Sequence, residues 1–219
     1  MQKDFIIALA WPEGMVASTN AWYDVFFAKN DKYRVGHSAV VLVDRLTTEI
    51  HYFDFGRYHS PKNFGRVRNQ ETDHDVKINL LAKIKYNEIL NIKDILIEIK
   101  NNAAFHGEGT LYASILNDVS FNKAYNYAKK IQDKGLILYG PFVYRGTNCS
   151  RFVASVMRKS SPTFIKNARL KLPFCISPSP KRNVGIANAD FYKVGDNLVK
   201  KVKRNILESY FKSIERSWF

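Results

Sequence analysis

Short apolar runs and apolar–polar alternation recur along the chain and predict β-strands. Residues 5–11 (FIIALAW) are apolar throughout and stop at a Pro-Glu-Gly turn, which is typical of a buried strand. Residues 36–43 and 49–55 are rich in β-branched and aromatic side chains, and the short stretch between them predicts a hairpin. The expected strands are residues 5–11, 36–43, 49–55, 76–84, 109–116 and 136–139.

Apolar residues at helical spacing predict the helices. Residues 121–134 form one such segment, with Ser120 or Asp118 as its cap and Gly135 as its end. The other expected helices are residues 20–29, the stretch after Asn91, the stretch after Asn148 and residues 203–217, whose apolar stripe must pack on the rest of the protein.

Two stretches lack this periodicity. Residues 56–68 contain many Gly, Pro and basic residues and predict a loop, and residues 160–190 are irregular. No internal repeat and no linker divides the chain. The pattern therefore predicts a single α+β domain over residues 1–219.

The formal net charge of +14, from 34 Lys and Arg against 20 Asp and Glu, gives a field that attracts anionic partners. The basic residues are spread along the chain, and no zinc finger or RNA-binding sheet signature accompanies them. A solvated basic surface is therefore favoured over nucleic-acid binding, and recognition of an anionic partner stays an alternative.

Two cysteines, Cys149 and Cys175, do not make a disulfide framework or a zinc motif, and Cys175 is expected to pack as an apolar thiol. The histidines lack the spacing of a metal site, so no metal and no cofactor is expected. The N-terminal apolar run lacks the features of a signal peptide, and no apolar stretch reaches the length of a membrane span. We expect a cytoplasmic protein without an integral membrane segment.

Cys149 is the residue with the strongest chemical signal. Turn residues precede it, and apolar residues at helical spacing follow it, so it is predicted to stand at the first turn of a helix. Unpaired N–H groups and the positive end of the helix dipole favour the thiolate there.

A nucleophilic cysteine needs a base and a group that orients the base. His37 follows Gly36 at the start of a predicted strand and is the candidate base. An odd number of residues in the following turn puts His51 on the side of His37, whereas an even number puts Tyr52 and Asp54 there. Either His51 or Asp54 could therefore be the residue that orients His37, and His51 is slightly favoured.

Arg57, Arg66 and Arg68, with Tyr58 and His59, lie close together in the sequence and form a candidate anion site. Solvated loop arginines are the favoured interpretation.

The segment NCSRFV at residues 148–153 resembles the Asp-Cys-Ser-Gly-Phe-Val signature of NlpC-type papain-like cysteine hydrolases. The segment GHSAVVL at residues 36–42 is similar to the histidine strand of that family, and Ile50-His51 to the Ile-His that follows it. Here the histidine precedes the cysteine, an order that resembles the circularly permuted, lecithin:retinol acyltransferase-like branch. Asn148 and Arg151 depart from the family pattern.

The resemblance implies a papain-like antiparallel sheet packed against helices, with the nucleophile at a helix N-terminus. Cys149 would attack a carbonyl carbon, His37 would transfer the proton, and His51 would orient His37. The backbone N–H at Cys149 would stabilise the oxyanion. The resemblance also makes Tyr139, Tyr144 and Ser150 candidates for contacts with the substrate or the oxyanion.

These observations predict a cysteine-dependent hydrolase or acyltransferase acting on an amide, ester or thioester of a small-molecule, peptide or lipid substrate. Peptidoglycan peptide is the usual target of the family, but the expected lack of an export signal argues against it. The alternatives are a non-catalytic binding module of the same fold that recognises an anionic partner, and a nucleic-acid-binding protein.

Overall fold

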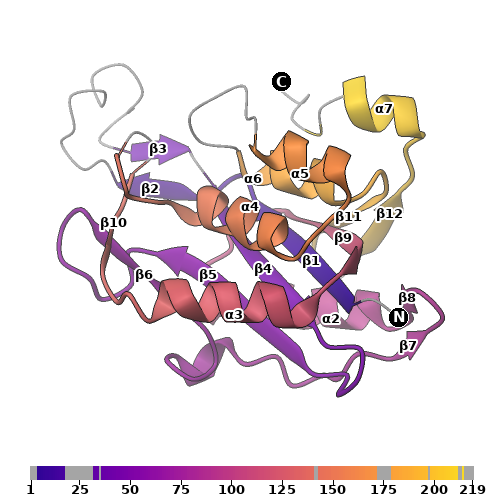
Figure 1. Ribbon diagram of the computed structural model, residues 1–219, viewed down its shortest axis with the longest axis horizontal. Helices are drawn as coiled ribbons and strands as arrows, with labels where there is room; N and C mark the ends of the chain where they lie inside the picture. Colours follow the sequence, from indigo (N-terminus) through magenta and orange to yellow (C-terminus); the bar gives the residue numbers. More distant parts are fainter. Residues whose placement is uncertain are drawn as a thin grey trace.

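An eight-stranded sheet forms the middle layer of the molecule (Figure 1), and every neighbouring pair of its strands is antiparallel. The computed structural model describes residues 4–17, 32–34, 36–140, 143–171, 179–196, 198–211 and 214. The strand order is β10 (Ile137–Leu138), β6 (Phe64–Arg68), β5 (Ile50–Gly56), β4 (His37–Val43), β1 (Asp4–Trp11), β9 (Leu111–Val119), β11 (Phe191–Val194) and β12 (Val199–Val202).

Helices cover both faces of this sheet. In Figure 1, α3 (Phe121–Gln132), α4 (Cys149–Lys159), α5 (Phe164–Lys171) and α6 (Pro180–Ala187) lie in front of it, and α2 (Ile92–Asn101) lies behind it. The smaller elements are η1 (His74–Val76), η2 (Ala103–Phe105), α7 (Ile206–Phe211) and the short strand pairs β2 (Met15–Ala17) with β3 (Lys32–Arg34) and β7 (Ile84–Lys85) with β8 (Glu88–Ile89). None of the helices in the described part of the chain is long and apolar enough to cross a membrane.

The two covered faces explain why residues 5–11 of β1 are all apolar. Ile7 and Leu9 belong to the core on the α2 side, whereas Ile6 and Ala8 belong to the core under α3, α4 and α6. Because successive side chains of a strand point to opposite faces, a strand with two buried faces favours apolar side chains along its whole length. The sheet is thus the middle layer of three.

Most of the expected elements near the site are confirmed. The strand at residues 5–11, the hairpin over residues 36–55, the helix after Asn91, the helix capped by Ser120 and the helix that begins at Cys149 are all present. The Ser120 hydroxyl accepts a hydrogen bond from the N–H of Lys123.

Three expectations are wrong in detail. Residues 56–68, expected as a loop, include strand β6, and residues 160–190, expected to be irregular, include α5 and α6. Residues 76–84, expected as a strand, pair only at Ile84 in β7. Within the expected helix 203–217 the structure has α7, and the expected helix 20–29 and Cys175 lie outside the described residues.

Gly36 sets the position of the residue that begins β4. Its φ is +66°, and a Cβ atom there would lie 2.4 Å from the carbonyl oxygen of Trp11 and 2.8 Å from Cα of Pro12. The Gly36 N–H donates to the carbonyl of Gly14 at 3.0 Å. Only glycine fits both this conformation and this space, so His37 enters the sheet at a fixed point.

We expect Gly36→Ala to lower the free energy of unfolding by about 2 kcal/mol or more, because it adds a steric clash to the strain of a positive φ. Gly135→Ala is the matched control, since Gly135 has a φ of +67° but nothing within 4 Å of its Cβ position. Strain alone predicts about 1 kcal/mol there. Urea denaturation measures both values, and equal losses would contradict the steric argument.

Candidate active site

His37 and Asp54 meet on one face of the β4–β5 hairpin. The register pairs Val43 with Ile50 and Ala39 with Asp54, so the connection at residues 44–49 has an even number of residues. Nε2 of His37 lies 3.0 Å from Oδ2 of Asp54. The structure therefore selects the alternative with Asp54 beside His37.

His51 does not reach His37. It pairs with Leu42 in the register, which puts its side chain on the opposite face of the sheet, and its ring lies 5.3 Å from the rings of both Phe121 and Tyr125. Its Nε2 lies 3.4 Å from a carboxylate oxygen of Glu49. The expectation that His51 orients His37 is corrected, because the parity of the connection turns it away.

The carboxylate of Asp54 is fully buried and accepts hydrogen bonds from four side chains. Oδ2 accepts from the hydroxyls of Tyr52 at 2.9 Å and Tyr58 at 2.8 Å, and from Nη2 of Arg68 at 2.8 Å, in addition to its contact with His37. Oδ1 accepts from Nε of Arg68 at 3.1 Å. Burial by itself would raise the pKa of Asp54, but the hydrogen bonds and positive charges of His37 and Arg68 outweigh it and hold this pKa well below its usual value.

His37 is protonated more readily than an ordinary histidine. Burial opposes its charged form, but hydrogen bonds to Asp54 and Cys149 and the negative charges of both groups raise its pKa to about 9. Trp11 stacks on the ring, with centroids 5.7 Å apart, and the Tyr58 hydroxyl lies 3.3 Å from Nε2. The imidazole thus lies between a carboxylate and a thiol and is fixed by aromatic neighbours.

Cys149 is the first residue of α4, as expected. The side chain of Asn148 caps the helix by accepting from the N–H of Arg151 at 2.9 Å, and Cys149 is 7% exposed. Ser150 is buried, and its carbonyl accepts from the side-chain amide of Asn183 in α6. The cap leaves Cys149 at the positive end of the helix, where negative charge is favoured.

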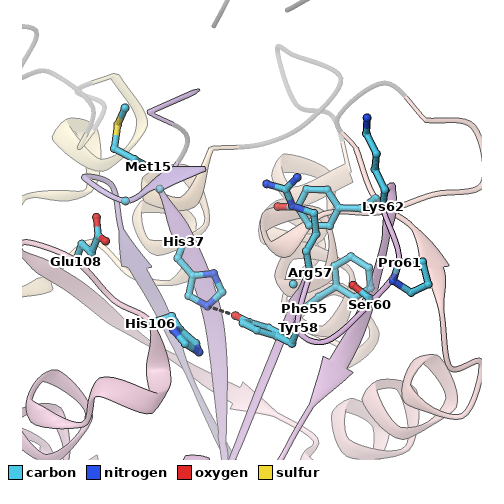
Figure 2. Close-up of a pocket in the computed structure, with 14 residues that line it drawn as sticks. Met15, His37, Phe55, Arg57, Tyr58, Ser60, Pro61, Lys62, His106 and Glu108 are labelled. Atoms are coloured by element: carbon cyan, nitrogen blue, oxygen red, sulfur yellow. Dashed lines mark hydrogen bonds between the residues drawn. The ribbon is translucent and has the colours of Figure 1, made fainter. Parts of the chain in front are cut away.

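A cavity of about 560 Å³ opens beside His37 (Figure 2). Its lining includes Tyr58, Arg57 and Tyr139, but the structure separates the two tyrosines suggested for substrate contact. Tyr139 lines the cavity, whereas Tyr144 is 84% exposed and is not part of the lining.

Arg66 and Arg68 are not solvated loop residues. Both lie in β6: Arg68 is 3% exposed and binds Asp54, and Arg66 forms two hydrogen bonds, of 2.7 and 2.6 Å, with Asp73. Sequence reasoning missed the role of Arg68 because a run with Gly, Pro and Arg is typical of a loop. Arg66 and Arg68 stand on either side of the apolar Val67, and this alternation of polar and apolar residues is the pattern in the sequence that could have predicted a strand.

No group of three or more His, Cys, Asp and Glu side chains within the described ranges is placed to hold a metal ion.

A family model for TseH-like type VI secretion system effectors matches residues 6–164, a range that contains His37, Asp54 and Cys149. The chain belongs to this family. It is also similar to the crystal structure of the type VI secretion system effector TseH over 92% of this chain and 99% of that chain, with a TM-score of 0.56 and 18% sequence identity. No curated protein matches the chain.

The similarity to TseH and the large antiparallel sheet fit a papain-like fold, as the sequence motifs implied. The family shown is the TseH-like one, and the assignment to the lecithin:retinol acyltransferase-like branch stays a prediction.

We expect Arg68→Met to lower the free energy of unfolding by about 3–5 kcal/mol, because it leaves the buried Asp54 without its cationic partner. Arg66→Met is the matched control two residues away in β6, where the Arg66 side chain is 23% exposed and loss of its pair with Asp73 predicts about 1 kcal/mol or less. Urea denaturation near neutral pH measures both. Similar losses would show that Asp54 does not depend on Arg68.

The raised pKa of His37 predicts a pH dependence of stability. A group whose pKa rises on folding stabilises the folded state below its unfolded pKa of 6.5, and this contribution is lost as pH rises through about 9. The loss amounts to about 3 kcal/mol between pH 6.5 and 9. His37→Gln should remove this part of the pH dependence, whereas His51→Gln should retain it. Urea denaturation across this pH range compares the variants, and an unchanged profile in His37→Gln would contradict the assignment.

Proposed function

We propose that this protein is a cysteine hydrolase that cleaves an amide bond, with Cys149 as nucleophile, His37 as acid and base, and Asp54 as the group that orients His37. The observation that carries the proposal is the position of His37, whose Nε2 lies 3.0 Å from Oδ2 of Asp54 and whose pKa is raised by both Asp54 and Cys149, the first residue of α4. A nucleophile, a base and a carboxylate in this order are the components of a hydrolytic triad.

The reaction begins with a proton on His37 and negative charge on Sγ of Cys149. Sγ attacks the carbonyl carbon of the substrate and forms a C–S bond, and the carbonyl oxygen becomes an oxyanion near the backbone N–H at Cys149. His37 donates its proton to the leaving nitrogen as the C–N bond breaks. His37 then takes a proton from water, which attacks the thioester and releases the acid and the thiolate.

Asp54 holds the imidazole in one orientation and stabilises its protonated form. Because its own charge is bound by Arg68 and two tyrosine hydroxyls, Asp54 stays ionised throughout the cycle. Asp54 therefore contributes a fixed negative charge and does not exchange a proton with His37.

We further propose that the protein acts as a type VI secretion effector and that its first substrate to test is the peptide of peptidoglycan. Its family consists of TseH-like effectors, and the NlpC-like motifs suggest a peptide amide. A secretion system exports its own effectors, so the expected lack of an export signal no longer argues against a target outside the cytoplasm. Hydrolysis is favoured over acyl transfer because the description of the family names effectors and does not name acyltransferases.

The test uses purified peptidoglycan and measures the release of new amino groups and the masses of the fragments. Cys149→Ser and His37→Ala are expected to lower the rate about 10⁴-fold or more, and Asp54→Asn about 10²-fold or more. His51→Ala is the control on the other face of the sheet and should retain the wild-type rate.

Equal rates in the wild type and Cys149→Ser would contradict the proposal. No release of amino groups by the wild type from peptidoglycan would contradict the substrate. Binding without cleavage would favour the non-catalytic module.

A further inference from the structure

The cavity beside His37 has opposite charges on its two walls. Arg57 and Lys62 line one wall, and Glu108 lines the other, with His37 between them (Figure 2). A substrate bond that reaches His37 must therefore lie between a cationic side and an anionic side.

The cationic wall is held in place by aromatic stacking. The guanidinium carbon of Arg57 lies 5.4 Å from the ring centroid of Tyr139, and this ring stacks on Phe55 with centroids 5.8 Å apart and an angle of 7° between the planes. Phe55 is fully buried in β5. The stack places the charge of Arg57 at the cavity without much loss of side-chain freedom on binding.

The loop that carries both cations, residues 57–63, is fixed at several points. Nε of Arg66 donates to the carbonyl of Tyr58 at 3.0 Å, and the hydroxyl of Ser60 donates to the carbonyl of Phe64 at 2.9 Å. The N–H of Tyr139 donates to the carbonyl of Asn63 at 2.8 Å. These bonds connect the loop to β6 and to the segment before α4, so the cationic wall is built before substrate arrives.

Two neighbouring arginines already have carboxylate partners within the protein. Arg66 binds Asp73 and Arg68 binds Asp54, and neither arginine lines the cavity. The basic residues that line the cavity on this side are Arg57 and Lys62.

We propose that Arg57 and Lys62 form a subsite for a carboxylate of the substrate, so that the enzyme selects acidic peptides whose carboxylate lies beside the bond that is cut. A guanidinium binds a carboxylate through charge-assisted hydrogen bonds, and Glu108 repels a carboxylate from the opposite wall. The subsite rests on the proposed function, because it takes the bond beside His37 as the one that reacts.

The subsite can be tested with thiol reagents before the natural substrate is known. Iodoacetate and iodoacetamide have similar size, and each forms an S–C bond with the Cys149 thiolate as iodide leaves with the bonding electrons. 3-Maleimidopropionate and N-ethylmaleimide form a second pair with the carboxylate farther from the sulfur, and in each the thiolate adds to a ring carbon and its neighbour takes up a proton. Peptide mass spectrometry separates modification of Cys149 from that of Cys175.

The readout is the ratio of second-order rate constants for the acidic and the neutral reagent at Cys149, at 0.15 M salt. We expect at least one of the two ratios to fall about fivefold or more in Arg57→Ala and in Lys62→Ala, because each variant removes a charge that attracts the carboxylate. Lys93→Ala removes an exposed charge on α2, on the other side of the sheet, and should keep both wild-type ratios. Lys62 is exposed, so Lys62→Ala should fold even if Arg57→Ala disturbs the stack.

The two hypotheses fail in different ways. If Cys149 reacts much faster than Cys175 but both ratios are the same in all variants, the carboxylate subsite is overturned and the proposed catalytic role of Cys149 stands. If both cysteines of the wild type react equally slowly with all four reagents, the proposed function is contradicted, and the subsite with it.

Discussion

The buried carboxylate of Asp54 is the group on which the geometry of the site depends. A charge with no exposure to water is unfavourable unless it is paired and hydrogen-bonded, and here its partners come from three neighbouring strands and the loop after β5. Satisfying Asp54 therefore brings His37 of β4 and Arg68 of β6 to the same point. The contacts that stabilise the buried charge also orient the imidazole ring.

Charges of opposite sign alternate from Arg68 to Asp54 and His37. Because Arg68 also binds Asp54, the combined field of this pair at His37 is weaker than that of a carboxylate paired with the imidazole alone. The start of α4 lies on the other side of the imidazole, and the positive end of a helix favours negative charge there. With a pKa of about 9, His37 is protonated near neutral pH.

Sequence patterns predicted the elements that carry the site but not all of its members. β1, the hairpin and the start of α4 follow from local signals, namely apolar runs, β-branched residues and turn chemistry. The choice between His51 and Asp54 depends on the parity of residues 44–49, which local composition does not reveal. Arg68 is buried only because a carboxylate lies fourteen positions earlier on a neighbouring strand, and such long-range pairing is not visible in a basic, glycine-containing segment.

The hairpin also constrains how this protein can vary in evolution. A slip of the β4–β5 pairing by one residue would exchange the two faces of β5, moving Asp54 into the opposite core and His51 beside His37. A slip by two residues would preserve the face that each side chain occupies. We therefore expect relatives that retain a carboxylate at this position to keep this register, and to place any change in length within the connection at residues 44–49.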